Sequence, residues 1–286
     1  MIIYASTSFI SPTPSSVEEA IDILQSLTLD GIEIGSTHQF AANFAQIVQS
    51  KLKLPALVHN YCPPAPVDLI INLASTNEEI RIASLNHALS CLEFASLIGA
   101  SLYTVHPGFM AEPQTAIRQE NSQSAYDFQF AAQRTPLALA FAQMRKSLET
   151  LLIRANELGI DLAVESEGSL THPGILLLET PAEYQALQAD FGWDLGVNFN
   201  LAHSWFAAQR HGFTLGDLII QLDGQIRAVE ISHNQGHKDE HKPLQKNGHL
   251  LPFIDLLPNV PLILEFRDAN QQDIANSIEI LKEIGF

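Results

Sequence analysis

Short apolar runs alternate with longer amphipathic stretches along almost the whole chain. Each run is rich in Val, Ile and Leu and carries few charges, which is typical of a parallel strand buried on both faces. Eight such strands are the number that closes into a barrel. We expect the strands at Ile2–Ser6, Gly31–Gly35, Ala56–His59, Leu102–His106, Asp161–Glu165, Leu195–Phe199, Ile226–Ile231 and Pro261–Phe266.

The stretches between these runs have helical periodicity and recognisable ends. Ser15 or Ser16 can cap a first helix, because Glu18 and Glu19 follow in capping-box register. Three further helices are clearest: one that opens at Thr76-Asn77-Glu78-Glu79 and ends at Gly99, then Leu137–Glu157, then Asp273–Leu281. Strand and helix alternating in this way predict an α/β protein, a single (β/α)8 TIM-barrel domain over residues 1–286.

A polar insertion interrupts this alternation at about residues 111–136. The segment is rich in Gln, Ser and Ala and directly follows a predicted strand end. Long insertions after barrel strands cover the catalytic face, so a lid or substrate-shaping loop is one interpretation. A disordered surface insertion is the other.

Polar side chains follow the ends of the third to eighth strands. In a closed parallel barrel these carboxyl ends converge on one face, so residues distant in sequence meet there. Glu165 and Glu167 share a face of their strand, and parity alone does not separate their roles. The residues concerned are His59, His106, Glu165, Glu167, Asn200, His203, Glu230, Asp239, His241, Glu265 and Arg267.

Such a convergence of carboxylates and imidazoles points to metal binding. Carboxylates gathered without counter-charge cost several kcal/mol in desolvation and repulsion, and divalent cations remove that cost. Zn, Mn, Co and Mg suit N and O ligands of this kind. A single strand-end histidine is more often structural, but the coincidence over six strands favours a metal site. Histidines without that context are assigned to structural or surface roles: His38, His87, His172, His211 and His249.

The charge and cysteine content limit the classes of partner. Lys and Arg number 15 against 32 Asp and Glu, a net charge of −17, which disfavours nucleic acid. Two cysteines, Cys62 and Cys91, are too few for a disulfide scaffold and fit a reducing compartment. The first residues carry no signal-peptide pattern, and no apolar window is long enough to cross a bilayer. We therefore expect a cytoplasmic protein without a membrane partner.

The order and spacing of several pieces resemble the xylose isomerase-like TIM-barrel superfamily, which includes sugar phosphate isomerases and epimerases and endonuclease IV. The likeness runs from about Gly31 to Arg267, and no single piece is decisive. The pieces are His59, Ile71-Asn72-Leu73, His106-Pro107-Gly108, Glu165 with a nearby Gly, the pair Asn200 and His203, Asp239-Glu240-His241, and Leu264-Glu265.

The resemblance implies one to three divalent ions, Zn or Mn above all. His59, His106 and a bridging Glu165 resemble the family's first metal site. His203, Asp239 and His241 resemble its third metal site. The middle site departs from the family twice, with Asn200 where the family has Asp and Glu230 where it has His. With Glu165 and Glu265, this middle site is all oxygen, which favours Mn or Mg.

Three functions follow from the resemblance. The first is an isomerase or epimerase of a sugar or sugar phosphate, with Glu165 and Glu265 moving the proton and His203 holding a substrate oxygen. Arg267 would bind a substrate oxyanion or phosphate, or instead pair with Asp268. The second is an endonuclease IV-like phosphoester hydrolase, for which a small substrate suits the charge better than DNA. The third is a metal-stabilised sugar-binding barrel without catalysis. The sequence leaves a homo-oligomer open.

Overall fold

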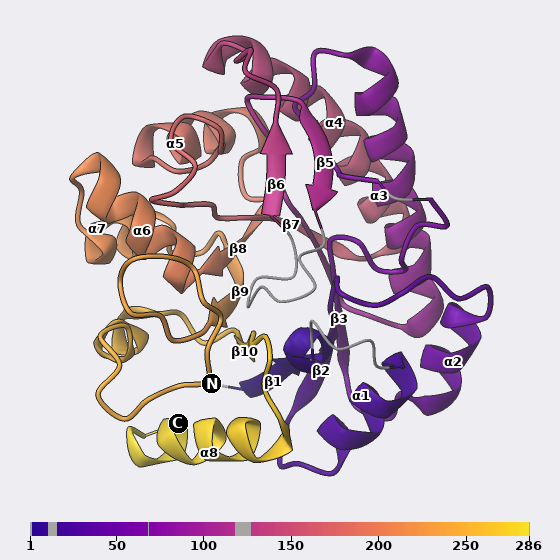
Figure 1. The fold of residues 1–286 in the computed structure, drawn as a ribbon, viewed down its shortest axis with the longest axis vertical. Helices are drawn as coiled ribbons and strands as arrows, with labels where there is room; N and C mark the ends of the chain where they lie inside the picture. Colours follow the sequence, from indigo (N-terminus) through magenta and orange to yellow (C-terminus); the bar gives the residue numbers. More distant parts are fainter. Residues whose placement is uncertain (1, 11–15, 68, 118–126, 286) are drawn as a thin grey trace.

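The computed structural model describes residues 2–10, 16–67, 69–117 and 127–285. At its centre, eight parallel strands form a closed barrel in the order β1-β10-β9-β8-β7-β4-β3-β2 (Figure 1). The eight strands and the (β/α)8 class predicted from the sequence are confirmed, with strand ends differing by one or two residues. The bounds are β1 Ile2–Ser6, β2 Gly31–Ile34, β3 Ala56–His59, β4 Leu102–Val105, β7 Asp161–Glu165, β8 Gly196–Asn200, β9 Ile226–Ile231 and β10 Pro261–Leu264.

Helices surround the barrel and have the capping residues that their sequences predict. Ser16 accepts a hydrogen bond from the backbone N–H of Glu19 and caps the first helix, whereas Ser15 lies outside the described residues. Gly99 and Gly159 end the two longest helices in the left-handed conformation. The helices are α1 Val17–Gln25, α2 Phe44–Lys51, α3 Glu78–Ile98, α4 Leu137–Leu158, α5 Pro181–Phe191, α6 Leu201–His211, α7 Leu215–Gln221 and α8 Gln271–Glu283, with short 3-10 turns η1 Thr7–Ile10 and η2 Leu251–Leu256.

No helix in the part of the chain that the structure describes combines the length and apolarity needed to cross a membrane.

Strand alternation decides which side chains enter the barrel. The floor of the interior is an apolar layer formed by Tyr4, Leu57, Leu102, Ala163, Ala228 and Ile263. Side chains two residues apart on a strand share a face. On four of these strands, the side chain two residues after the floor residue therefore also points into the barrel. Those positions hold buried polar side chains: His59, Glu165, Glu230 and Glu265. The carboxyl end of the barrel is therefore polar above an apolar floor.

The insertion after β4 contains an antiparallel hairpin, β5 Pro113–Ile117 with β6 Asp127–Phe130 (magenta arrows in Figure 1). Glu112, just before β5, accepts hydrogen bonds from Ser75 Oγ at 2.5 Å and Asn72 Nδ2 at 3.2 Å. These bonds fasten the base of the hairpin to the segment that precedes α3. The remainder of the predicted lid, residues 118–126, lies outside the described residues.

His38 is one of the histidines assigned to a structural role, and it lies buried near the end of β2. The Thr7 hydroxyl accepts a hydrogen bond from the backbone N–H of Gly35 at 2.9 Å and lies 2.7 Å from His38 Nε2. Burial lowers the pKa of His38 from 6.5 to about 4. The neutral imidazole is therefore the form that the fold accommodates.

This burial predicts a loss of stability in mild acid. As the pH drops below 6.5, His38 takes up a proton in the unfolded chain before it does so in the folded protein, so the free energy of unfolding falls between pH 6.5 and about 4. A pKa lowered from 6.5 to about 4 corresponds to a loss of about 3 kcal/mol. Urea unfolding at pH 7 and pH 4.5 measures it. His38→Gln keeps a polar side chain beside Thr7 and should show a correspondingly smaller pH dependence; equal slopes for both proteins would contradict the prediction.

Candidate metal centre

The first cluster, called trio A, consists of His59, His106 and Glu165. His59 ends β3, His106 directly follows β4, and Glu165 ends β7, so three strand ends bring them together. Glu165 Oε2 lies 3.0 Å from His106 Nε2 and 3.4 Å from His59 Nε2. The two imidazole Nε2 atoms are 3.3 Å apart. One atom of each side chain thus faces a common point.

The opposite nitrogens of the trio A histidines have carboxylate partners of their own. His106 Nδ1 contacts Glu167 Oε1 at 2.5 Å, and His59 Nδ1 lies 3.1 Å from Glu230 Oε1. A carboxylate at Nδ1 holds the proton there, which leaves the Nε2 lone pair for a cation and orients the ring. Glu165 and Glu167, which parity could not separate, therefore differ: one faces the common point and the other supports a histidine.

The second cluster, called trio B, consists of His203, Asp239 and His241. His203 lies in the first turn of α6, while Asp239 and His241 belong to the segment after β9. Asp239 Oδ2 is 3.1 Å from His203 Nε2 and also contacts His241 Nε2. His203 Nδ1 lies 3.2 Å from the Ser166 carbonyl, and His241 Nδ1 lies 3.1 Å from Glu265 Oε2. Trio B repeats the arrangement of trio A.

Both trios fit a divalent ion. The ligand atoms within each trio lie within 4.8 Å of one another. Glu165 Oε2 and His241 Nε2 are buried without a hydrogen bond in the described structure, as lone pairs facing a shared point would be. Two imidazoles with one carboxylate and an open position form a set typical of catalytic zinc. His106 and Asp239 have the most exposed side chains of the two trios, 25% each, so both trios open to solvent on one side.

The side chains of the expected middle site contact one another differently. Asn200 Nδ2 donates to Glu230 Oε2 at 2.9 Å, Glu165 Oε1 at 3.1 Å and Glu265 Oε2 at 3.4 Å. Among the described residues a third group, Glu33, His59 and Glu230, also has ligand atoms within 4.8 Å of one another, but it meets at His59 Nδ1, whereas Glu165, Glu230 and Glu265 do not together form such a group. The structure thus brings together the four residues predicted for the middle site. Their contacts are hydrogen bonds that the Asn200 carboxamide donates to the three carboxylates.

Without bound ions, the pKa values of these carboxylates and of His241 depend on burial and on the charges of their neighbours. Burial raises the pKa of Glu230, and Glu165 and Glu265 raise it further, to about 7. Burial also raises the pKa of Glu265, but His241 more than offsets this and holds it at about 2. Burial and Arg267 lower the pKa of His241, yet Asp239 and Glu265 bring it to about 9. A divalent ion would displace such histidine protons on binding.

Two supporting residues were not predicted from the sequence. Glu33 on β2 is buried, neither of its side-chain oxygens has a hydrogen bond in the described structure, and Oε2 lies 3.7 Å from His59 Nδ1. Asn198 on β8 donates to Glu230 Oε1 at 2.7 Å. A charge inside the otherwise apolar run Gly31–Gly35 was the available signal for Glu33. Both residues lie beneath trio A and act on it through Glu230 or His59.

Arg267 lies beside trio B and has no ion pair among the described residues. Its backbone N–H donates to the His241 carbonyl at 2.8 Å, and its Nε is buried without a hydrogen bond. Asp268, the alternative partner, instead has Lys242 Nζ at 3.9 Å. Arg267 is therefore a cation beside trio B, and its charge lowers the pKa values of both His241 and Glu265.

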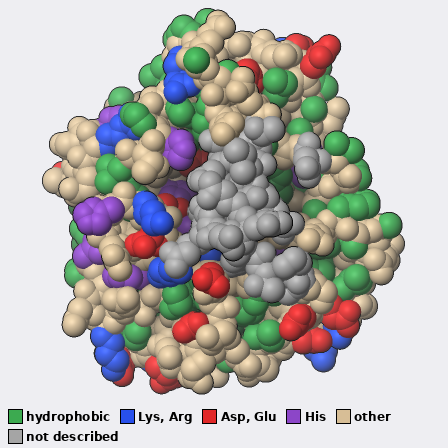
Figure 2. Space-filling model, viewed as in Figure 1, with side chains coloured by type: hydrophobic (Ala, Val, Ile, Leu, Met, Phe, Trp, Pro, Cys, Tyr) green, Lys and Arg blue, Asp and Glu red, His purple; other side chains and the backbone are tan. Residues whose placement is uncertain are grey.

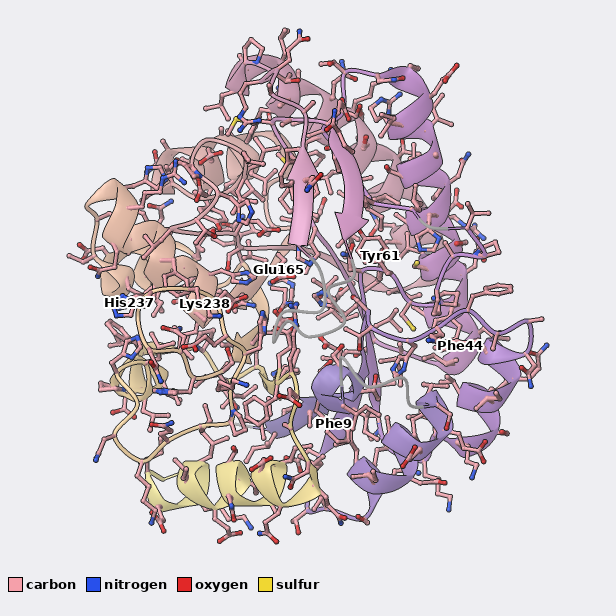
Figure 3. All side chains as sticks on the ribbon, viewed as in Figure 1. Phe9, Phe44, Tyr61, Glu165, His237 and Lys238 are labelled. Atoms are coloured by element: carbon pink, nitrogen blue, oxygen red, sulfur yellow. The ribbon has the colours of Figure 1, made fainter. Side chains whose placement is uncertain are left out.

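The figures place these groups on one face of the barrel. Glu165 lies near the middle of the ring of strands, and His237 and Lys238 lie in the segment after β9 (Figure 3). Histidine side chains, with acidic and basic ones, gather over α6 and that segment (Figure 2). The candidate centre therefore occupies the carboxyl end of the barrel, where the polar layer above the floor meets solvent.

A sequence model of the xylose isomerase-like TIM barrel family matches residues 21–284. The chain belongs to this family. The resemblance inferred from the sequence is therefore confirmed. A family relative from Methanocaldococcus jannaschii, described as an uncharacterized protein, is 23% identical over 285 residues, which cover 98% of this chain and 97% of the relative.

Solved structures share the xylose isomerase-like fold over nearly the whole chain. A D-tagatose 3-epimerase-like protein has a TM-score of 0.74 at 20% identity, covering 99% of this chain and 96% of the other. D-psicose 3-epimerase from Clostridium cellulolyticum has a TM-score of 0.70 at 9% identity, with 99% of both chains covered. A Thermus thermophilus protein soaked with zinc chloride has a TM-score of 0.64 at 19% identity, also with 99% of both covered. At these identities the likeness is one of fold.

Proposed function

We propose that this xylose isomerase-like barrel is a divalent-metal-dependent hydrolase of a small phosphoester. The observation that carries the proposal is the pair of trios, each with two imidazole nitrogens and a carboxylate oxygen aimed at one point. Hydrolases use such sets because three protein ligands leave a position free for water or substrate. The sequence ranked an isomerase or epimerase first; the hydrolase is placed first here because both imidazole-containing trios are complete, whereas the middle site has the Asn200 hydrogen bonds.

The residues of the chain have distinct tasks in this proposal. Trio A and trio B would each hold one ion, which when bound acidifies water and polarises a phosphoryl oxygen. Glu167 and Glu230 keep the protons on the far nitrogens of His106 and His59, which orients both rings. Arg267 binds a non-bridging phosphate oxygen at the rim. The net charge of −17 selects a small substrate over a nucleic acid.

Hydrolysis of a phosphate panel tests the proposal. On protein purified without added metal, we expect turnover of p-nitrophenyl phosphate or bis-p-nitrophenyl phosphate, lost on chelation and restored by zinc. Arg267→Gln should raise KM for phosphate esters more than it lowers kcat, because the guanidinium binds charge present in substrate and transition state alike. Cleavage of neutral carboxylic esters or amides with no cleavage of any phosphoester would reject the phosphoester assignment.

A sugar isomerase or epimerase is the second candidate, and the fold neighbours favour it. Proteins named for epimerase activity on tagatose and psicose share the fold over 99% of this chain. Glu165 and Glu265 also lie at the barrel mouth, at the ends of β7 and β10, which β8 and β9 separate, as two proton-transfer groups would need. Exchange of a ketohexose or ketose-phosphate C–H with solvent deuterium, without phosphate release, would establish this candidate over the hydrolase. Tight sugar binding with neither reaction would indicate the non-catalytic barrel.

A further inference from the structure

The side chain of Asn200 occupies the centre of three buried carboxylates. Its Nδ2 has Glu165 Oε1, Glu230 Oε2 and Glu265 Oε2 at 3.1, 2.9 and 3.4 Å. Glu165 ends β7, Glu230 lies on β9, and Glu265 directly follows β10. The Asn200 carboxamide therefore lies at the carboxyl end of the barrel, as trio A and trio B do. The position between the trios is thus filled by a donor that belongs to the protein.

The orientation of this carboxamide is determined by its other end. Asn200 is the N-cap of α6, and its Oδ1 accepts a hydrogen bond from the backbone N–H of His203 at 3.2 Å. A backbone N–H can only donate, so the oxygen must face the helix and the NH2 group must face the carboxylates. The side chain cannot present its oxygen to a cation at this point without losing the helix cap.

We propose that the Asn200 carboxamide takes the place of a third cation, so that this barrel holds two ions, one in each trio. The inference rests on the trios of the proposed function as metal sites, and it does not depend on the reaction they catalyse. The NH2 group donates to carboxylate oxygens that would otherwise need a cation, and its nitrogen lies within 3.4 Å of an oxygen of each carboxylate. Glu230 thereby becomes a positioning residue, held by Asn198 and Asn200 and oriented towards His59.

Asn200→Asp tests the inference directly. Asp caps a helix as well as Asn but replaces the donor with a fourth carboxylate, so the cluster needs a cation. After equilibration with zinc and removal of free ions, native mass spectrometry should count two ions in the natural protein and three in Asn200→Asp. Asn77→Asp is the matched control: it makes the same change at the N-cap of α3, which lies outside both trios, and should keep two ions.

The remaining outcomes also decide the question. Asn200→Ser retains a capping hydroxyl while removing the NH2 group, and should bind a third ion even if Asn200→Asp does not fold. Three ions or fewer than two in the natural protein, or two in both Asn200 variants, would overturn the inference. Two ions in the natural protein and three in Asn200→Asp, with no phosphoester hydrolysis by the natural protein, would support the two-ion inference and reject the proposed function. The failure of one is therefore distinguishable from the failure of the other.

Discussion

Replacing Glu165 by glutamine should lower the proposed phosphoester turnover by about a thousandfold, the loss expected when a charged group at the reacting centre is removed. Glu165 has a partner on each oxygen: Oε2 faces His59 and His106, and Oε1 lies 3.2 Å from His203 Nδ1 and accepts from Asn200. A neutral amide of the same shape cannot supply the negative charge in trio A. Native mass spectrometry of Glu165→Gln should therefore show the loss of one of two ions, beside the loss of activity.

Glu167→Gln is the matched control for this substitution. Glu167 carries the same charge two residues along, but it contacts His106 Nδ1 and lies outside the trio itself. Loss of a carboxylate that orients a metal-binding histidine costs roughly 10- to 100-fold in activity or metal affinity. Glu167→Gln should therefore keep a measurable rate and both ions at saturating zinc. Equal losses in the two variants would mean that Glu165 has no role beyond that of its neighbour.

Chelation should lower the melting temperature of the natural protein by about 15 °C. An ion at a free concentration a thousandfold above its dissociation constant stabilises the folded state by about 4 kcal/mol, and two such sites contribute about twice that. For a chain of this size each kcal/mol corresponds to about 2 °C. The physical cause is the buried set of carboxylates and imidazoles, including Asp239 Oδ1 and His241 Nε2, which have no hydrogen bond in the described structure.

Single-site variants separate the two contributions to this shift. His241→Ala removes a trio B ligand and should retain about half of the zinc-dependent shift, since trio A is unchanged. His87→Ala, on α3 outside both trios, should retain all of it. Comparing each protein with and without chelator removes the effect of the substitution on packing. Melting that chelator leaves unchanged in the natural protein would contradict the assignment of both trios as ion sites.

Much of the barrel could be predicted from local pattern. Runs of four to six apolar residues separated by capped helices are a periodic signal that each element carries by itself, and all eight strands form where expected. The hairpin of β5 and β6 was not predicted, because its polar sequence lacks the alternation of a half-buried strand. Its strands pair with each other, Glu112 anchors its base, and the Phe130 ring packs against Phe109.

The candidate centre was predictable in its residues and less so in their roles. His59, His106 and Glu165, and likewise His203, Asp239 and His241, come together as the strand-end pattern predicts. Glu33 was missed, although it is the charged residue of an apolar run. Glu230 was predicted as a middle-site ligand; its oxygens contact His59 and the amides of Asn198 and Asn200. Neither residue type nor spacing distinguishes a ligand from a residue that supports one.

The sequence by itself determined the closed barrel, because strand and helix periodicity are properties of consecutive residues. It also determined which polar residues reach the carboxyl end, because a side chain's face follows from its parity on the strand. Only the tertiary structure decided which atom of each side chain meets which partner. That choice depends on the register between strands and on the cap of α6, which turns the Asn200 oxygen to His203 and its NH2 group to three carboxylates.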